Sequence, residues 1–529
     1  MSTVAGSRQL VRLASRRDRI VLPIWLYVLA GLVGSSAYTI KGLYPDEASR
    51  QSLVVAIGAV PTAGALYGRL VDDSLGAITA WRVGVLGGVI AAVMSIMLVS
   101  RHTRAEEQNG RHELVAAGAV GRYAALAAAL QLVVTANLLA GVLIGAVAAV
   151  FGLPAAGSFA LGAAIAGSGL FFTGLAAVTA QVAETSRGAN GLALAFLGLF
   201  YLVRAAADMS TFTWLLWCSP IGWLEQVRAF DGDRWWVLLL PVAGFALSVA
   251  LAGYLSARRD YGSGLLPVRP GPAYAGADTR GVLGLAWRLH RGVLAGWMAG
   301  LFVAGAAFGS FAKDIDAFLD SARVKKIMTQ LGGGTQDPVD AYLWTIMALC
   351  GLMAGAFAVS VVLRARSEEA GGRAEVVLAG GVGRLRWALS HLAVAAVGSA
   401  ALLAVAGFGA GLADGLRTHD VSGALGSLLG AALVQWPAVM LVAALAMLLF
   451  GLVPRYANAA WAPFGLFVFL TLVGPELNLG QVALDFSPFS QLPRLPGAQL
   501  TAVPLLWISA IALAAAVAGL AAFRRRDVG

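Results

Sequence analysis

The chain has 529 residues, of which 59% are hydrophobic and only 12% are charged, and its formal net charge is +10 at pH 7. Ordinary soluble domains carry roughly 25% charged residues, so this composition excludes a water-soluble fold. Because a membrane-spanning helix needs about 20 mostly apolar residues, the length suits about 12 spans and leaves no room for a large soluble domain.

Apolar stretches in the sequence predict an all-α integral membrane protein with about 12 transmembrane helices. In chain order the stretches cover residues 20–40, 83–100, 123–151, 155–183, 189–207, 236–257, 293–312, 343–363, 386–412, 421–452, 457–474 and 502–523. Prolines and glycines in residues 258–292 predict a polar linker. It would join a first six-span half, residues 1–257, to a second half, residues 293–529.

Basic residues predict the orientation of the spans. If the N-terminus is cytoplasmic, the segments on the cytoplasmic side hold 25 of the 38 Lys and Arg residues. The positive-inside rule therefore predicts a multi-pass protein of the cell membrane with both termini in the cytoplasm. Several arginines precede the first apolar run, and no small-residue cleavage site follows them, which indicates a retained first span rather than a signal peptide.

Two further classes of site are not expected from the composition. No basic patch with interleaved aromatic residues is present, so we expect no nucleic-acid partner. Cys218 and Cys350 lie far apart with no metal-ligand spacing around either, so we expect no metal site and no disulfide framework.

An internal repeat relates the two halves. The segment RAEEQNGRHELVAAGAVGR at 104–122 aligns without a gap to RSEEAGGRAEVVLAGGVGR at 366–384, with 12 of 19 positions identical. Both halves also end alike, in Arg258-Arg259-Asp260 and Arg525-Arg526-Asp527. Six spans per half is an even number, so the two halves enter the membrane from the same side and form parallel repeats.

The repeated charged segment follows the second span of each half. Its mixture of charged and apolar positions is typical of a short helix at the membrane surface, and Gly118 and Gly380 are expected to end that helix in the left-handed conformation. A solvated loop that only enforces topology is the simpler interpretation, but topology requires basic residues and no fixed pattern of acids and glycines. A docking element, used twice against a partner with two equivalent surfaces, explains the pattern better.

At these residues the sequence resembles the membrane subunits of type-2 ATP-binding-cassette exporters, in particular the fused twelve-span exporters of polyketide antibiotics. The resemblance rests on EEQNGRHELVAAGAVGR, EEAGGRAEVVLAGGVGR, SPIGWLEQVRAFDGDRWW at 219–236 and RRDYGSGLLPVRPGPA at 258–273. It covers essentially the whole chain. One departure is that SPFSQLPRLPGAQL at 487–500 lacks the GDRWW of the first half.

The resemblance implies that the repeated segments are coupling helices that contact a nucleotide-binding ATPase subunit, present as two copies. The residues at this contact would be Glu106, Glu107, Gly110, Arg111 and Glu113 in the first half and Glu368, Glu369, Gly372, Arg373 and Glu375 in the second. The implied function is ATP-driven export of amphipathic drugs or antibiotics through the lipid bilayer.

The ATPase is expected to be a separate chain. A phosphate-binding loop needs the pattern G-x-x-x-x-G-K-[ST], and none of the four lysines here is followed by Ser or Thr. We therefore expect no catalytic residues and no cofactor in this chain, with ATP and Mg bound by the partner.

An ion-coupled secondary multidrug transporter of the twelve-span class is the alternative. Such carriers place ionisable residues inside their spans, whereas here Glu184, Arg204 and Asp208 lie near span ends. Arg204 and Asp208 are four residues apart, so they can form a structural pair on one helix, or act as a gate.

A substrate path between the halves is expected, by resemblance, to follow the second and fifth spans of each half. Methionine and aromatic side chains offer large, adaptable contact areas to bulky apolar ligands, although the same side chains commonly face lipid or neighbouring helices. The candidates for this path are Met94, Met97, Phe196, Phe200, Tyr201, Met353, Phe357, Phe464 and Phe467.

Two regions outside the spans are also amphipathic. Residues 313–330 place apolar side chains on one helical face, which predicts a surface-lying helix. The tryptophans within 212–236 predict an interfacial belt, with an exit gate as the second interpretation.

Overall fold

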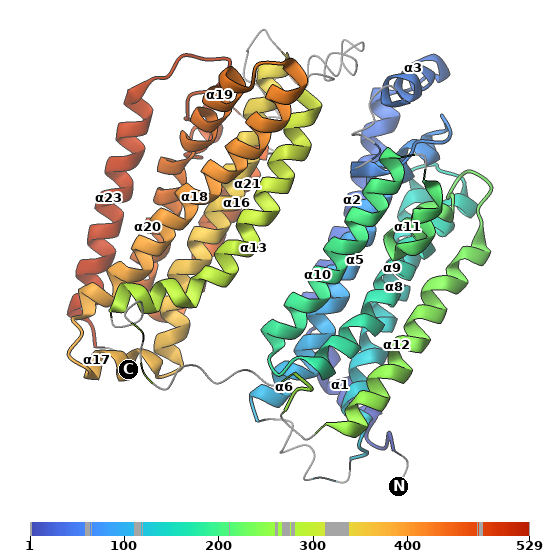
Figure 1. The fold of residues 1–529 in the computed structure, drawn as a ribbon, viewed down its shortest axis with the longest axis horizontal. Helices are drawn as coiled ribbons and strands as arrows, with labels where there is room; N and C mark the ends of the chain where they lie inside the picture. The colour runs from blue at the N-terminus through green and yellow to red at the C-terminus, as the bar shows by residue number, and fades with distance from the viewer. Residues whose placement is uncertain are drawn as a thin grey trace. The chain divides into compact units, whose positions relative to one another are not determined.

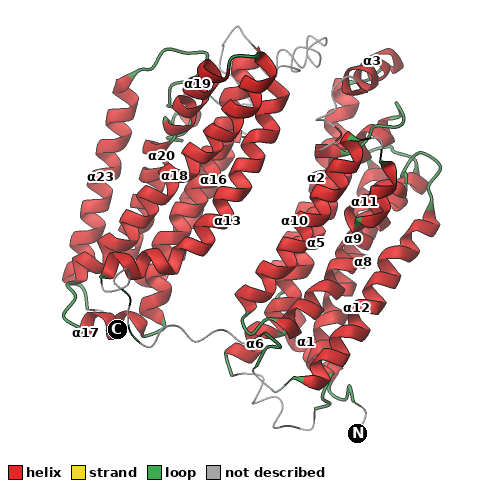
Figure 2. Cartoon of the chain, viewed as in Figure 1, coloured by secondary structure: helices red, strands yellow, loops and turns green. Residues whose placement is uncertain are grey.

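A computed structural model of the chain divides into two compact units, unit 1 (Met1–Pro270) and unit 2 (Gly271–Gly529) (Figure 1). The structure describes residues 3–58, 64, 66–110, 118, 120–210, 212–259, 263–266, 274, 276, 281–312, 338–472, 474 and 480–527. These residues are helical or lie in loops and turns (Figure 2), apart from an isolated parallel bridge between Ala183 and Leu266. The predicted surface helix at 313–330 and the prolines of the predicted linker lie outside the described residues.

Among its described residues, unit 1 has six long helices, together with short surface helices. The long helices are α2 (Val21–Leu43), α5 (Leu75–His102), α8 (Ala124–Val150), α9 (Ala155–Val182), α10 (Ser186–Met209) and α12 (Leu239–Arg258), the last preceded by η2 (Trp235–Leu238). The short elements are α1 (Ser7–Arg17), α3 (Glu47–Gly58), α6 (Arg104–Gln108), η1 (Thr213–Cys218) and α11 (Pro220–Gln226).

The described helices of unit 2 follow a similar order, with a turn inside the fourth span and a 3-10 segment at the start of the fifth. Its helices are α13 (Val282–Phe311), α16 (Pro338–Ala370), α17 (Arg373–Ala379), α18 (Arg384–Thr418), α19 (Val421–Leu433), α20 (Trp436–Leu452), η5 (Pro454–Ala460), α21 (Trp461–Leu472), α22 (Gln481–Leu484) and α23 (Ala502–Arg525).

In each unit, taken by itself, the first span begins and the last span ends at the same end of the bundle (Figure 1). We call this end the terminal end and the opposite one the distal end. Among the described residues, eleven helices are long and apolar enough to cross a membrane. The prediction of an all-α integral membrane protein with about 12 spans is confirmed.

One predicted span of unit 2 agrees with the expectation, and the next one differs from it. The stretch 421–452 is a single candidate span, Val421–Leu452, in which a short turn at the buried Gln435 separates α19 from α20. Pro437 follows in the first turn of α20, where a missing N–H is tolerated. In the stretch 457–474 the α-helix begins only at Trp461, because a 3-10 segment with a non-helical Tyr456 precedes it. Its 12 α-helical residues extend about 18 Å, which is too short to cross a hydrocarbon core of about 30 Å.

Small residues bring the helices of unit 1 together. A Cβ atom on Gly162 of α9 would lie 2.1 Å from the carbonyl oxygen of Gly141 on α8, so only glycine permits this approach. The buried Asn137 of α8 donates to Ser95 Oγ of α5 at 2.9 Å and thereby links a third helix to the contact. Close backbone packing of α5, α8 and α9 forms the frame that holds the segments at both ends of unit 1.

Candidate functional site

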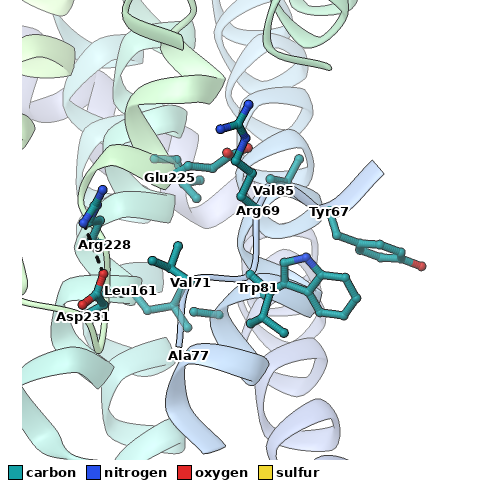
Figure 3. A pocket seen from close by; sticks show the side chains of 14 residues that line it. Tyr67, Arg69, Val71, Ala77, Trp81, Val85, Leu161, Glu225, Arg228 and Asp231 are labelled. Carbon is teal, nitrogen blue, oxygen red and sulfur yellow. Dashed lines mark hydrogen bonds and ion pairs between the residues drawn. The ribbon is translucent and has the colours of Figure 1, made fainter. Parts of the chain in front are cut away.

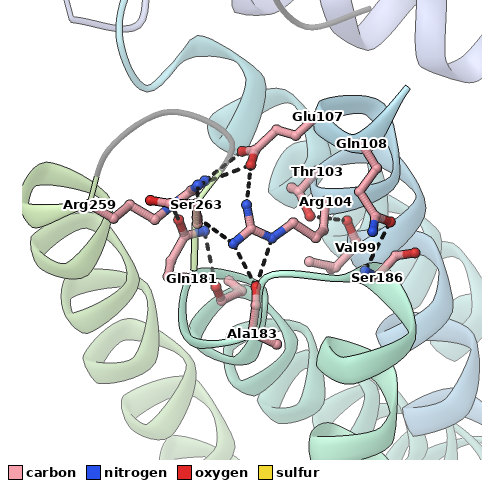
Figure 4. Close-up of polar contacts among 11 residues, drawn as sticks. Val99, Thr103, Arg104, Glu107, Gln108, Gln181, Ala183, Ser186, Arg259 and Ser263 are labelled. Atoms are coloured by element: carbon pink, nitrogen blue, oxygen red, sulfur yellow. Dashed lines mark hydrogen bonds and ion pairs between the residues drawn. The ribbon is translucent and has the colours of Figure 1, made fainter. Parts of the chain in front are cut away.

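The repeated charged segment of unit 1 begins as α6 at the terminal end, beside the ends of α9 and α12. Arg104 in α6 is only 1% exposed. Its guanidinium donates to the carbonyl oxygen of Ala183 at 2.8 and 2.6 Å and to that of Ser263 at 2.6 Å (Figure 4). Because Ala183 caps α9 and Ser263 follows α12, Arg104 joins the charged segment to the ends of two spans.

Glu107 lies between two arginines at the centre of this contact. It accepts from Arg104 Nη1 at 2.5 Å and from Arg259 Nη1 and Nη2 at 3.0 and 2.5 Å (Figure 4). Arg259 also donates to Gln181 Oε1 at 2.7 Å. We call Arg104, Glu107 and Arg259 the first Arg–Glu network. Its hydrogen bonds are charge-assisted, short and largely shielded from water. Charge-assisted hydrogen bonds are stronger than neutral ones, and shielding from water strengthens them further.

An equivalent contact is present at the terminal end of unit 2. Glu369, which aligns with Glu107 in the repeat, accepts two parallel hydrogen bonds from Arg526 at 2.6 and 2.8 Å. Arg366 lies 3.6 Å from the same carboxylate. We call Arg366, Glu369 and Arg526 the second Arg–Glu network. Both networks therefore tie the segment after the second span to the end of the last span.

A second hydrogen bond reproduces the same connection in both units. Arg122, the last residue of the first repeated segment, donates to the carbonyl oxygen of Ala257 at 3.0 Å. Its counterpart Arg384 donates to the carbonyl oxygen of Arg526 at 2.7 Å. Both ends of the repeated segment thus contact the C-terminal end of the last helix in their own unit.

The remaining acids of the segment are held differently in the two units. Glu106 forms an ion pair with Arg17 of α1, whereas its counterpart Glu368 accepts from Arg364 at 2.8 Å and from Arg373 at 2.7 Å. The Glu368 carboxylate raises the pKa of the Arg373 guanidinium by hydrogen bonding and charge attraction. One unit uses the N-terminal helix as the partner, and the other uses Arg364 of the preceding span and Arg373 of its own segment.

The predicted contact residues divide into buried and exposed groups. Glu107, Glu368 and Glu369 are largely buried and engaged within their own units, whereas Arg373 and Glu375 are exposed on α17 beside Val376, which is 77% exposed. Gly110 and Gly372 have φ angles of 68° and 70°, a left-handed conformation that favours glycine at both positions. The predicted residues Arg111 and Glu113 lie outside the described residues.

The prediction that Gly380 takes the left-handed conformation is wrong. Gly380 caps α17 with an ordinary φ of −76°, and the next residue, Gly381, has a φ of 82°. The left-handed turn after α17 therefore lies one residue later than predicted, at Gly381 instead of Gly380.

The candidate path residues are distributed between cores and surfaces. Met94 and Phe357 are fully buried, and Phe464 and Phe467 are nearly so, within the cores of their own units. The exposed candidates are Met97 and Phe196, and the partly buried ones are Phe200, Tyr201 and Met353. Among the candidates, Met97 on α5 and Phe196 on α10 have the largest exposed fractions, 50% and 37%.

A buried charge cluster occupies the distal end of unit 1. Arg204 of α10 is fully buried and donates to Glu225 Oε1 of α11 at 3.0 Å, while Asp208 Oδ2 lies 3.7 Å from the same guanidinium. Arg69 lies 3.7 Å from Asp208 and donates to the carbonyl oxygens of residues 207, 208 and 210 at the end of α10. The expected Arg204–Asp208 pair is thus part of a four-residue cluster.

A cavity of about 70 Å³ adjoins this cluster, between α5, α11 and the loop after α11 (Figure 3). Arg69, Trp81 and Glu225 line it, and an Arg228–Asp231 pair at 3.5 Å lies opposite. In the sequence, Glu225 lies in the connection between the candidate spans Ser186–Asp208 and Trp235–Arg258. Its burial, together with the negative charge of Asp208, raises the pKa of its carboxyl group to about 8. The cavity has room for water but not for a drug-sized ligand.

Sequence reasoning missed Arg259, Arg526, Glu225 and Arg69 as parts of these sites. The signal for the first two was available, because both halves end in the same Arg-Arg-Asp motif. Glu225 and Arg69 lie on separate segments that only the fold brings to Asp208. Among the described residues, no group of three or more His, Cys, Asp or Glu side chains is arranged to hold a metal ion.

Comparisons with known proteins agree with this architecture. Residues 280–524 match the family model described as the C-terminal domain of the multidrug efflux system permease Rv1217c. The whole chain is 44% identical over 530 residues to the multidrug efflux system permease protein Rv1217c of Mycobacterium tuberculosis, covering 100% of this chain and 96% of the relative.

Proposed function

The chain belongs to the family of the multidrug efflux permease Rv1217c, and we propose that it is the membrane-spanning subunit of an ATP-binding-cassette exporter. A separate ATPase, present as two copies, docks on the two repeated charged segments and supplies ATP hydrolysis. In this arrangement the terminal ends and both termini face the cytoplasm, and the protein resides in the cell membrane. The cargo is an amphipathic drug or antibiotic, with polyketide-like compounds as the first class to test.

The equivalent Arg–Glu networks are the observation that carries the proposal. In each unit they connect the segment after the second span to the end of the last span through a largely buried carboxylate, Glu107 or Glu369. A displacement of the segment is therefore transmitted to both spans together. This is the mechanical property that a coupling element needs, and it is built twice, as two copies of an ATPase require.

The exposed surface of α17 provides the contact in unit 2. Glu375 is exposed in the first turn of α17, and Val376 beside it presents an exposed apolar side chain. An apolar centre with a charged rim is the usual composition of a protein interface. The buried Glu369 then acts as a positioning residue behind the contact.

ATP and Mg belong to the partner in this proposal. The four lysines of the chain, Lys41, Lys313, Lys325 and Lys326, have neither the glycine pattern nor the following Ser or Thr of a phosphate-binding loop. The chain's own contribution is to bind cargo and to convert the movement of its coupling segments into a change of access.

The test is reconstitution of the chain with its ATPase in liposomes and measurement of drug-stimulated ATP hydrolysis. Glu375→Arg reverses an exposed charge at the proposed contact, so we expect stimulation to fall at least about tenfold, as for a charge reversal at an interface. Glu47→Arg reverses an exposed acid of α3 at the distal end and is the matched control. Equal stimulation in both variants would contradict the docking role.

The buried cluster of Arg69, Arg204, Asp208 and Glu225 is the observation that favours an ion-coupled carrier as the second candidate. Ionisable groups buried in a transporter commonly mark an ion pathway. Transport by the reconstituted complex distinguishes the two functions: an exporter of the proposed class requires ATP and continues after collapse of the proton gradient. Transport by the chain alone, driven by that gradient, would establish the carrier instead.

A further inference from the structure

Helix α1 lies across the terminal end of unit 1. Residues just before it are held to the start of α8, because Tyr123 N–H donates to the carbonyl oxygen of Thr3 at 3.0 Å and Gly121 N–H to that of Ala5 at 2.9 Å. At its other end, α2 begins at Val21, only a short turn after Arg17. Since α8 and α2 both begin at the terminal end (Figure 1), α1 runs along this end rather than through the bundle.

One face of α1 packs on the unit and another face is basic. Ala14 is buried and α1 packs against α8, whereas Arg8, Arg12 and Arg16 are exposed. These three arginines are spaced four residues apart, so they form one continuous stripe along the helix. We call them the arginine stripe.

The stripe carries positive charge that no described carboxylate of unit 1 neutralises. Arg17, on a different face, forms an ion pair with Glu106. By contrast, Arg8, Arg12 and Arg16 form no ion pair with any carboxylate in the part of the chain that the structure describes. The stripe therefore presents three guanidinium groups to an external anion.

Exposed apolar side chains place the stripe at the level of lipid headgroups. Leu13, on the exposed side of α1 beside the stripe, is 61% exposed. Ile20 is 64% exposed, and Ile24, in the first turn of the spanning helix α2, is 55% exposed. An amphipathic helix with arginines beside exposed leucine and isoleucine, directly preceding a span, matches the interfacial zone of a bilayer.

We propose that the arginine stripe of α1 is a binding site for anionic phospholipid headgroups. The planar guanidinium groups of Arg8, Arg12 and Arg16 would donate paired hydrogen bonds to lipid phosphates, while Leu13 and Ile20 insert among the acyl chains. The stripe lies on α1, outside the repeated segment 104–122 on which the ATPase is proposed to dock in unit 1.

The bound lipid would also be connected to the charged segment of unit 1. Arg17, which directly follows the stripe, pairs with Glu106 of α6. The next residue, Asp18, is fully buried and lies 2.5 Å from His102 Nε2 and 3.0 Å from Arg101 at the end of α5. A shift of α1 toward the lipid would therefore move α6 and the end of α5 with it.

The experiment measures lipid retention by the full-length chain, without any ATPase, using native mass spectrometry during titration with dioctanoyl-phosphatidylglycerol or dioctanoyl-phosphatidylcholine. The wild-type chain should bind the phosphatidylglycerol more tightly. In the triple variant Arg8→Gln, Arg12→Gln, Arg16→Gln we expect its apparent affinity to fall on the order of a hundredfold. Phosphatidylcholine retention should be unchanged.

The matched control removes three arginines from the terminal end of unit 2. Arg288, Arg524 and Arg525 are exposed there, and their replacement by glutamine removes the same charge but should change phosphatidylglycerol affinity less than about threefold, because they do not form a stripe on an interfacial helix. Unchanged phosphatidylglycerol binding in the stripe variant, or an equal loss in both variants, would overturn the proposal. In a separate binding measurement with the ATPase, a stripe variant that keeps its lipid but loses affinity for the ATPase would assign the stripe to the protein partner instead.

Because the assay contains no ATPase, its failure leaves the proposed exporter function unaffected. A thermal unfolding curve in the same detergent checks that the triple variant folds. The variant Arg17→Gln supplies a second measurement, since it removes the connection to Glu106 but should retain lipid binding. Loss of lipid in Arg17→Gln alone would show that the charged segment, not the stripe, holds the headgroup.

Discussion

Unit 1 and unit 2 hold their terminal ends in the same way but build their distal ends differently. At the terminal ends, Glu107 pairs with Arg259 and Glu369 pairs with Arg526. At the distal end of unit 1, Arg204 is fully buried between Asp208 and Glu225. An element that is built twice serves a partner with two equivalent surfaces, whereas an element built once serves a task that one half performs alone.

The distal frame itself is shared, so the difference lies in the charges. Ser219 Oγ donates to the carbonyl oxygen of Phe200 at 2.8 Å, and its counterpart Ser487 donates to that of Phe467 at 3.4 Å. When SPIGW at 219–223 is aligned with SPFSQ at 487–491, Leu472 takes the position of Arg204. Both units therefore have a serine-to-carbonyl connection here, and at the position of the fully buried Arg204 unit 2 has a leucine.

Backbone strain is concentrated in the same part of unit 1. Arg228, Phe230 and Asp233 have φ angles of 48°, 69° and 37°, within a single loop after α11. Phe230 fills the space beside Gly76 and Gly157, whose Cβ atoms would lie 2.3 and 2.2 Å from its ring. Strained backbone persists where the surrounding structure holds it and is common at functional sites, which agrees with a specialised distal end in unit 1.

The largest expected effect is a difference in stability between two alanine variants, one at Arg104 in the first network and one at its counterpart Arg366 in the second. Arg104→Ala leaves a buried Glu107 with one partner fewer and removes three hydrogen bonds to carbonyl oxygens. We expect it to lower the free energy of unfolding by about 3–5 kcal/mol, as when one member of a buried ion pair is removed. Arg366→Ala breaks a single, partly exposed 3.6 Å contact and should cost at most about 1 kcal/mol. Denaturation in detergent micelles measures both, and equal losses would contradict the structural difference.

The next effect tests what the networks share. Double-mutant cycles with glutamine at Glu107 and Arg259, and at Glu369 and Arg526, should each yield a coupling energy of about 1–3 kcal/mol, because both pairs are bidentate and poorly accessible to water. Both cycles are measured by thermal unfolding of the purified chain. A coupling energy near zero in either unit would show that the Glu–Arg pair of that unit does not stabilise the fold.

A third effect concerns the distal cluster and depends on pH. Since the pKa of Glu225 is raised to about 8 from an ordinary 4.5, the folded chain keeps a proton that the unfolded chain releases between these values. The free energy of unfolding should therefore fall as pH rises through this window, by at most about 1.4 kcal/mol per pH unit for one proton. Glu225→Gln should flatten this dependence, measured by unfolding curves from pH 5 to 8. An unchanged slope would place the titration on another group.

The smallest expected effect is equal in the two units. Gly110 and Gly372 are left-handed, and a Cβ atom added to either would meet open space. Alanine at either position should therefore lower stability by about 1 kcal/mol through backbone strain alone. Matched unfolding curves for Gly110→Ala and Gly372→Ala check this, and a much larger loss in one unit would show that the turns differ after all.

Several features of the site were predictable because they are local or repeated in sequence. The positions of Glu107 and Glu369 follow from the aligned repeat, and the glycines Gly110 and Gly372, which both copies share, are left-handed. The Arg204–Asp208 pair was expected from helical spacing, although the structure shows that Glu225 and Arg69 complete it. Gly380 was assigned the turn that Gly381 forms, because spacing alone does not distinguish two adjacent glycines.

By itself, the sequence determined the all-α membrane class, the approximate number of spans and the two repeated segments, because hydrophobic length and an ungapped repeat are properties of the linear chain. Only the tertiary structure decided which of the repeated acids are buried and which are exposed. It did so by bringing Arg259 to Glu107, Arg526 to Glu369 and Glu225 to Arg204. A hydrogen bond depends on the distance between two groups in space, and helix packing sets that distance independently of their separation along the chain.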